Sequence, residues 1–408
     1  MEMLKRLCVL TSRVDVSVNA ETALTMALGC RSVKGMDSAV VGDRYDQIIV
    51  TAVTARVPAK VNLQLSVGPP RADGYHDLVT VFHALALFDE VTVAPADTDS
   101  VRVSGEGAAS VPLGGDNLAA RAVAALTDAV GAGCRDEPGL AIEIRKRIPV
   151  AAGLAGGSAD AAGALVACNE LWGTGLSQQE LAEVAGRVGS DVAFALLGGT
   201  AIGLSRGEQV TPALVSGTYH WVLAFAAEQL STAAVYAACD RLRAAQRRDG
   251  PGAAAAQQAP ASGTAQQPPA AQPVVGAAAQ QPLSGQPVTS QPAAGSWPAP
   301  ELSTALMAAL RSGDPAEVGP LLVNDLQPAA IALLPGLRRA LAAGREHGAL
   351  GAIVSGSGPT CAYLARDGAH ARDLAVALTS TGVCRSVVSV TGPAPGATVL
   401  SPAADRRR

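Results

Sequence analysis

Apolar and polar residues change their spacing in the first half of the chain, and this change divides two elements. Residues 140–146 alternate between apolar and polar side chains, which predicts a strand that ends in charge at Lys146. From Ala161 to Trp172 the apolar positions recur every three or four residues, which predicts one buried face of a helix. The segment that joins this strand to this helix contains the most informative residues of the chain.

This joining segment has the features of a loop that binds phosphate. Gly153, Gly156 and Gly157 let backbone N–H groups approach an anion closely, and Ser158 stands where the helix is expected to begin. The first turn of a helix offers unpaired donors and the positive end of its dipole. Neither the P-loop pattern GxxxxGK[ST] nor the dinucleotide pattern GxGxxG is present. A tight turn followed by an N-cap serine explains the same residues without any ligand.

The remaining pattern predicts a mixed α and β protein. Strands are expected over residues 51–65, 79–87, 90–94, 101–105, 219–226 and 386–391, and two more flank a second glycine-rich loop within 351–364. Helices are expected over residues 118–130, 178–188, 230–243, 302–310, 337–347 and 371–379.

Composition sets limits on the function. Hydrophobic residues make up 49% of the 408, so burial does not limit folding. The formal net charge is −4 and the basic residues do not cluster outside Arg406–Arg408, so we expect no nucleic-acid surface. The seven cysteines form no CxxC pair, which favours reduced thiols in the cytoplasm. The sequence contains no apolar run near the roughly 18 residues of a membrane span, so we expect no membrane partner.

Two segments stand apart from this pattern. Residues 1–50 are ambiguous and are interpreted as a leader of uncertain order. Residues 245–300 are composed mainly of Ala, Gln, Pro, Gly and Ser, which cannot bury a core, so we expect a disordered insert.

Several polar residues are candidates for chemistry. Lys60 and Asn62 share one face of a predicted strand, and Lys60 is either a solvated residue or an inward-facing functional one. Tyr75 and His76 lie side by side after an Asp-Gly turn, which suits a flat heterocycle but also fits a structural pair. Asp191 precedes an apolar run, either as a helix N-cap or as a catalytic acid.

Taken in order, five motifs resemble the GHMP small-molecule kinase superfamily. They are PAKVNL (58–63), RADGYH (71–76), IPVAAGLAGGSADAA (148–162), GSDVAF (189–194) and SGSGPTCAY (355–363). The resemblance implies an α+β fold of two domains. These are a ribosomal S5 domain 2-like N-terminal domain at 51–212 and a ferredoxin-like C-terminal domain at 213–398, interrupted by the insert and followed by a tail at 399–408.

The resemblance also implies an activity, the transfer of the ATP γ-phosphoryl group to a tertiary hydroxyl of a small acceptor that carries a cytidyl diphosphate. Lys60 and Asp191 match the catalytic pair, and Ser158 is a candidate ligand of Mg²⁺. The residues that match acceptor contacts are Asn62, Tyr75, His76, Thr232 and Tyr236. The residues that match the ATP loop are Pro149, Val150, Ala151, Ala152, Gly153, Leu154, Ala155, Gly156, Gly157 and Ser158. We expect a monomer or a weak homodimer.

The sequence departs from the family at Ala151, Ala152 and Ala155, where more glycine-rich members have Gly. A methyl group is tolerated at these positions if φ is negative there. The alternatives to this function are a GHMP kinase of the homoserine or mevalonate type, a non-catalytic ligand-binding relative, and a scaffold that uses the Pro/Gln-rich tract. The GYH element at 74–76 argues against the first of these.

Overall fold

The computed structural model describes residues 52–131, 133, 139–249 and 299–400. The predicted leader lies outside the described residues, as do residues 250–298 of the predicted insert. The larger sheet has the path β12-β1-β2-β4-β3, with β8 beside β1, β5 beside β2 and β6 beside β5. Its strands are β1 (Val53–Pro70), β2 (His76–Ala96), β3 (Ser100–Gly105), β4 (Gly139–Lys146), β5 (Thr200–Ser205), β6 (Gln209–Pro212), β8 (Val323–Asn324) and β12 (Thr398–Leu400).

A long hairpin of β1 and β2 is the centre of this sheet. The two strands pair antiparallel along their length, and the turn between them contains Gly74 at a φ of 80°. The prediction of two separate strands over 79–87 and 90–94 was wrong. The chain continues through this region as one strand, and the register shifts between Pro58 and Ala59 on the partner strand, so a β-bulge takes the place of the expected break.

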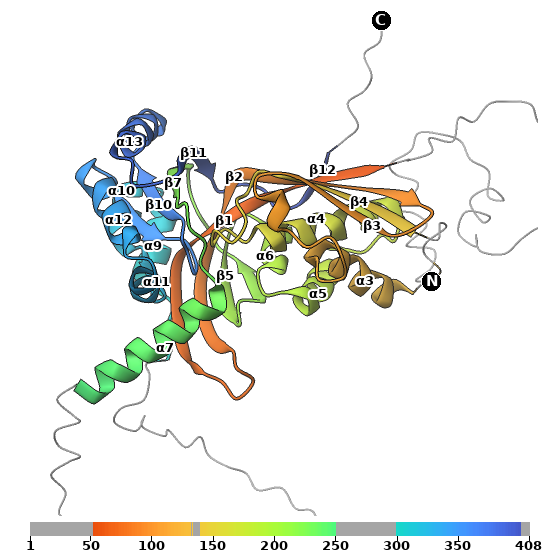
Figure 1. Cartoon of the computed structure of the whole chain (residues 1–408), viewed down its shortest axis with the longest axis horizontal. Helices are drawn as coiled ribbons and strands as arrows, with labels where there is room; N and C mark the ends of the chain where they lie inside the picture. The colour runs from red at the N-terminus through yellow and green to blue at the C-terminus, as the bar shows by residue number, and fades with distance from the viewer. Residues whose placement is uncertain (1–51, 132, 134–138, 250–298, 401–408) are drawn as a thin grey trace, which may run out of the picture. The chain divides into compact units, whose positions relative to one another are not determined.

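Four helices lie on one side of this sheet (Figure 1). Two of them, α4 and α6, pack on its strands, and the other two, α3 and α5, pack on those helices. They are α3 (Leu118–Val130), α4 (Gly156–Leu171), α5 (Gln178–Val188) and α6 (Val192–Leu197), with a short 3₁₀ turn, η1 (Ala108–Ser110), before α3. The sequence signals for their starts are confirmed where side chains cap them. Asn117 accepts hydrogen bonds at the start of α3, and Ser177 with Glu180 forms a capping box at α5.

The second sheet has the strand order expected of a ferredoxin-like domain. Its strands are β7 (Tyr219–Phe225), β9 (Gly351–Val354), β10 (Cys361–Ala365) and β11 (Ser386–Gly392). They lie in the order β11-β7-β10-β9, all antiparallel. The accompanying helices are α7 (Thr232–Asp249), α9 (Thr304–Ser312), α10 (Pro315–Val318), η3 (Gly319–Leu321), α11 (Gln327–Leu333), α12 (Gly336–Glu346) and α13 (Gly368–Thr381).

The strand β1 connects the two halves of the chain. Two short strands from the C-terminal half pair with it: β8 at Gln64–Leu65, and β12 at Thr54–Arg56. The second of these pairings extends to Leu400, into the predicted tail. Residues on β1 are therefore held by segments from both halves, which fixes the position of any side chain that β1 presents. Among the described residues, none of the helices is long and apolar enough to cross a membrane.

The packing of α4 on the hairpin yields a prediction about Gly163. A Cβ atom added there would lie 2.8 Å from Cγ2 of Val91 and 2.9 Å from Cγ2 of Val57. Gly163→Ala is expected to lower the stability by roughly 1–2 kcal/mol, because overpacking outweighs the gain in helix propensity. Gly186→Ala in α5 is the matched control. It meets no atom within 4 Å and is expected to gain about 0.5–1 kcal/mol. Thermal melting of both variants checks this, and a stabilised Gly163→Ala would contradict the packing of α4.

Candidate active site

Two glycine-rich loops from opposite halves of the chain meet beside β1. Thr360 donates its N–H to the carbonyl of Ala152, and the Ser355 hydroxyl donates to the carbonyl of Gly153. A Cβ atom at Gly153 would clash with the carbonyl oxygen of Ser355, so only glycine permits this approach. The N–H of Lys60 donates to the carbonyl of Leu154 at 3.3 Å, which fastens the first loop to the central strand.

The first loop does not meet, at two of its alanines, the condition of negative φ under which a methyl group is tolerated. Ala151 has a φ of 52° and Ala155 a φ of 59°, so both adopt the left-handed conformation that favours glycine. Each such residue costs roughly 1–2 kcal/mol. Ala152 is absent from the positive-φ residues and so meets the condition. Ala155 is also the N-cap of α4, so the helix begins at Gly156 and Ser158 lies inside its first turn. Ser158 is therefore not the N-cap, and the explanation of this segment as a serine-capped turn does not apply.

A chain of hydrogen bonds fixes the side chain of Lys60. Its Nζ donates to Oδ1 of Asn62 at 2.6 Å, and Nδ2 of Asn62 donates to Oγ1 of Thr80 at 2.8 Å. The Thr80 hydroxyl donates in turn to the carbonyl of Gln64 at 2.7 Å. Lys60 is 6% exposed. The predicted common face of Lys60 and Asn62 is confirmed, and the Lys60 ammonium is buried in a defined position.

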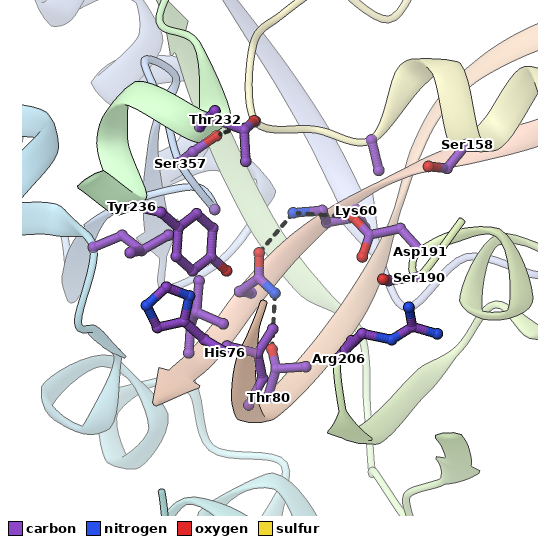
Figure 2. Close-up of a pocket in the computed structure, with 18 of the residues that line it drawn as sticks. Lys60, His76, Thr80, Ser158, Ser190, Asp191, Arg206, Thr232, Tyr236 and Ser357 are labelled. Carbon is purple, nitrogen blue, oxygen red and sulfur yellow. Dashed lines mark hydrogen bonds and ion pairs between the residues drawn. The ribbon is translucent and has the colours of Figure 1, made fainter. Parts of the chain in front are cut away.

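Asp191 lies across the site from Lys60, and Figure 2 shows the two side chains directed toward each other. Its Oδ2 is 3.9 Å from Nζ of Lys60, and its side chain is 31% exposed. Asp191 occupies the N-cap position of α6, but its carboxylate makes no capping hydrogen bond. The carboxylate of Asp191 is therefore available to groups in the cavity and is not used to cap the helix.

Burial controls the electrostatics of this site. It lowers the pKa of Lys60, because the ammonium loses water, while the carboxylate of Asp191 partly opposes this effect. Burial also raises the pKa of the Tyr236 hydroxyl, and the nearby charge of Asp191 adds to that rise. Tyr236 therefore stays neutral near pH 7, and Lys60 is an ammonium that releases its proton more readily than an exposed lysine.

The structure brings most of the predicted residues together around one cavity of about 800 Å³. The predicted residues that line it are Lys60, Asn62, Tyr75, His76, Ala151, Ala152, Gly153, Ala155, Gly156, Gly157, Ser158, Asp191, Thr232 and Tyr236. Three members of the predicted ATP loop do not line it. Leu154 is 1% exposed and packs in the core, while Pro149 and Val150 line a neighbouring hollow of about 460 Å³.

One end of the cavity is organised around His76, which is the first residue of β2 and not a loop residue as expected. Its Nε2 lies 3.0 Å from Oδ1 of Asp240, and the Tyr236 ring lies 5.0 Å from the imidazole. Tyr75 is on the turn before β2 and is 53% exposed, with the guanidinium of Arg206 5.1 Å from its ring. Aromatic faces and polar edges thus gather at this end, as a planar heterocycle requires.

Sequence reasoning missed several residues that line the cavity. They are Thr80, Ser190, Arg206, Asp240 and Ser357. Asp240 follows Tyr236 by four residues on α7, so the helical spacing of the two could have revealed it. The Ser357 hydroxyl lies 3.0 Å from that of Thr232, which joins the second glycine-rich loop to α7. Arg206 follows β5 in a short turn, and nothing in its local sequence indicates that it lines the cavity.

Nothing in the described residues resembles a protein-built metal cage. Among them, no group of three or more His, Cys, Asp or Glu side chains could hold a metal ion. The cavity does offer the Ser158 hydroxyl and the Asp191 carboxylate, both oxygen ligands of the kind that Mg²⁺ prefers. Mg²⁺ commonly keeps waters and substrate phosphates as its other ligands, so this donor set fits such an ion.

Two family models match segments of the chain, and known enzymes match it over most of its length. Residues 117–199 match the model of the GHMP kinases N terminal domain, and residues 306–384 match that of the GHMP kinases C terminal domain. A 4-diphosphocytidyl-2-C-methyl-D-erythritol kinase from Thermobifida fusca is 48% identical over 86% of this chain and 99% of its own length.

Solved structures show the same fold. A crystal structure of 4-(cytidine 5'-diphospho)-2C-methyl-D-erythritol kinase is 29% identical, with a TM-score of 0.57 and coverage of 83% of this chain and 98% of that one. A homoserine kinase from Cytophaga hutchinsonii has a TM-score of 0.57 at 18% identity, covering 88% of this chain and all of its own. The second likeness concerns the fold alone.

The lowered pKa of Lys60 predicts how stability changes with pH. A lysine whose pKa is lower in the folded state destabilises the fold while it is charged, and this penalty disappears as pH rises toward the unfolded value. The free energy of unfolding of the wild type should therefore rise relative to that of Lys60→Met between pH 7 and pH 10, by at most about 1.4 kcal/mol per pH unit. The melting temperature of the wild type should rise with it. Parallel melts at four pH values check this. A difference between the two melting temperatures (wild type minus Lys60→Met) that stays constant or falls as pH rises would show that burial does not disfavour the ammonium.

Proposed function

Because the chain belongs to the GHMP kinases, and within them to the 4-diphosphocytidyl-2-C-methyl-D-erythritol kinases, we propose that it phosphorylates the 2-hydroxyl of that cytidyl compound with ATP. This reaction belongs to the non-mevalonate route to isoprenoid precursors. The observation that carries the proposal is the placement of Lys60 and Asp191 opposite each other, in one cavity with the glycine-rich loop that begins α4.

Lys60 and Asp191 act together on the acceptor hydroxyl. A tertiary hydroxyl is a crowded, weak nucleophile, so a positioned base accelerates its attack. Asp191 accepts the hydroxyl proton while the oxygen forms its bond to the γ-phosphorus and ADP leaves. Lys60 stabilises the negative charge that develops on that oxygen and orients the Asp191 carboxylate. Asn62 and Thr80 hold the Lys60 ammonium in place through the hydrogen bonds of the central hairpin.

The glycine-rich loop binds the phosphates of ATP. Gly153, Gly156 and Gly157 line the cavity with backbone, and α4 directs the positive end of its dipole there. Phosphoryl transfer depends mainly on position and on charge stabilisation, which such donors provide. Ser158 is the residue that would hold Mg²⁺. When bound, this ion neutralises charge on the phosphate oxygens.

The other end of the cavity binds the cytidyl group. Tyr75 stacks on the base, and His76, held by Asp240, hydrogen-bonds to its edge. Tyr236 packs against His76 and closes this end, with Thr232 beside it. Arg206 provides a guanidinium cation close to Tyr75, where a diphosphate would extend toward the γ-phosphoryl group.

The proposal includes the arrangement of the chain. Residues 51–212 form the N-terminal domain and residues 213–398 the C-terminal domain, each containing one of the two matched family segments. The acceptor is a small molecule, and we propose a monomer or a weak homodimer in the cytoplasm. A GHMP kinase of the homoserine or mevalonate type is disfavoured, because the Thermobifida fusca relative, at 48% identity, is a 4-diphosphocytidyl-2-C-methyl-D-erythritol kinase.

The role of Asp191 can be separated from a structural role. Asp191→Asn keeps the shape of the side chain but cannot accept a proton, so kcat should fall by a factor of about 10²–10⁴. The KM values for ATP and for the acceptor should change little, because the lost interaction belongs to the transition state. The double variant with Lys60→Met should be less impaired than the product of the single effects, because the two residues act as a unit. Near-normal kcat together with a lowered melting temperature would make Asp191 a helix cap.

The role of Tyr75 in recognising the base can be tested in the same assay. Tyr75→Ala removes a stacking surface that contributes about 1–3 kcal/mol, so the acceptor KM should rise roughly 5- to 150-fold. The KM for ATP should be unchanged. Tyr75→Phe is the matched control, because it keeps the ring and should keep the acceptor KM. If Tyr75→Ala changed the KM for ATP and left the acceptor KM unchanged, the assignment of this turn to the acceptor would be wrong.

A further inference from the structure

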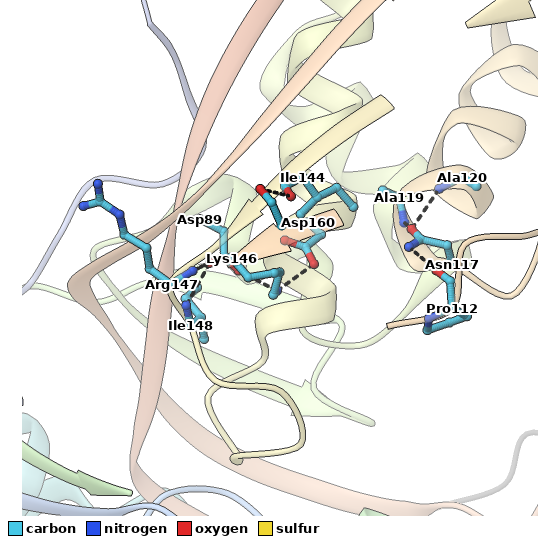
Figure 3. A network of polar contacts seen from close by, with 11 residues as sticks. Asp89, Pro112, Asn117, Ala119, Ala120, Ile144, Lys146, Arg147, Ile148 and Asp160 are labelled. Carbon is cyan, nitrogen blue, oxygen red and sulfur yellow. Dashed lines mark hydrogen bonds and ion pairs between the residues drawn. The ribbon is translucent and has the colours of Figure 1, made fainter. Parts of the chain in front are cut away.

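A buried cluster of one lysine and two carboxyl groups lies at the base of the glycine-rich loop, outside the cavity (Figure 3). Nζ of Lys146 lies 2.5 Å from Oδ2 of Asp89 and 2.7 Å from Oδ2 of Asp160. The three residues are 3%, 0% and 3% exposed, respectively. They come from the end of β4, from β2 and from the beginning of α4. Burying charges is costly, so they persist in a fold only where they satisfy one another.

The cluster holds the start of the loop. Oδ1 of Asp89 accepts the backbone N–H of Arg147 at 2.5 Å and that of Ile148 at 2.8 Å. These are the first two residues after β4. The carboxylate of Asp89 therefore fixes the direction in which the chain leaves the sheet, while its other oxygen binds Lys146.

The same ammonium holds the end of the loop. Nζ of Lys146, which precedes the loop in the chain, donates to Oδ2 of Asp160, which follows the loop in the first turns of α4. At the start of α4 the packing is close, since a Cβ atom at Gly156 would lie 3.1 Å from Nζ of Lys146. Among the described residues, Oδ1 of Asp160 has no hydrogen-bond partner, so the attachment of α4 to the cluster depends on its single bond to Lys146.

The loop between these two attachments is strained. Ala151 and Ala155 both have positive φ, and such conformations persist only where the surrounding structure enforces them. A loop freed at one end would relax and turn its backbone donors away from the cavity. Because none of the three cluster residues lines the cavity, any effect they have on a bound phosphate passes through the loop.

We propose that Lys146, by bridging Asp89 and Asp160, is a positioning residue that clamps both ends of the glycine-rich loop in the conformation that binds the triphosphate of ATP. This proposal rests on the proposed function and adds a specific requirement to it. Loss of the bond from Lys146 to either carboxyl group weakens ATP binding and leaves binding of the acceptor unchanged.

Asp160→Ala removes the single hydrogen bond that attaches α4 to Lys146. It is expected to raise the KM for ATP roughly 10- to 100-fold, as small displacements of positioning groups do. The acceptor KM should stay within about twofold, because that end of the cavity is formed by β2, its preceding turn and α7. The rise in melting temperature that ATP produces should shrink in parallel, because that rise follows ATP affinity. Asp160→Asn should restore a near-normal KM for ATP, because its amide oxygen still accepts from Lys146.

Leu165→Ala is the control for a general loss of stability. Leu165 lies in the same helix and is fully buried in the core, so its truncation destabilises α4 without touching the cluster. Its KM for ATP should equal that of the wild type when both are assayed well below their melting temperatures. If Asp160→Ala does not fold, Asp160→Ser replaces it, because a serine side chain is also too short to reach Nζ.

Each other outcome overturns the clamp. If the KM for ATP changed equally in Asp160→Ala and Leu165→Ala, the cluster would only stabilise the fold and would not position the loop. An unchanged KM for ATP in Asp160→Ala, with an active wild type, would refute the clamp and leave the proposed function intact. A wild type that neither binds ATP nor phosphorylates the cytidyl acceptor would refute both.

Discussion

The close approach of two backbone loops around one buried ammonium is the constraint on which the site depends. The first loop is fastened to β1 at Lys60, and the second contacts the first at Gly153. A Cβ atom at Gly356 would lie 2.9 Å from Nζ of Lys60, so the second loop also closes over the ammonium. Residues far apart in the chain thus enclose the group that faces Asp191. Phosphoryl transfer requires such fixed charges, because its barrier falls mainly through placement and electrostatic stabilisation.

The central hairpin connects this site to the rest of the fold. β1 carries Lys60 and Asn62, and strands from the C-terminal half pair with it on both sides of these residues. β2 carries His76 and Thr80 toward the cavity and Asp89 toward the buried charges under the loop. One pair of strands therefore positions the acceptor end, the catalytic pair and the foundation of the glycine-rich loop.

Local patterns in the sequence predicted the elements well and the contacts between them less well. The change of spacing between residues 140–146 and α4 predicted the loop, and the capping signals at Asn117 and Ser177 were confirmed. The positive φ of Ala151 and Ala155 was not predictable, because alanine gives no sign of a left-handed conformation that distant packing imposes. Arg206 also escaped prediction as a cavity residue, since only the folding of β5 beside the hairpin brings it there. Asp240 was missed although its helical spacing from Tyr236 indicates a shared face.

The most direct test of the central claim is transfer of labelled γ-phosphoryl from ATP by the purified wild-type chain to a panel of acceptors. The account predicts rapid labelling of 4-diphosphocytidyl-2-C-methyl-D-erythritol at its 2-hydroxyl and little labelling of homoserine, mevalonate or an acceptor that lacks the cytidine. Equal or faster labelling of an acceptor without the cytidine, or hydrolysis of ATP with no labelled product, would contradict it.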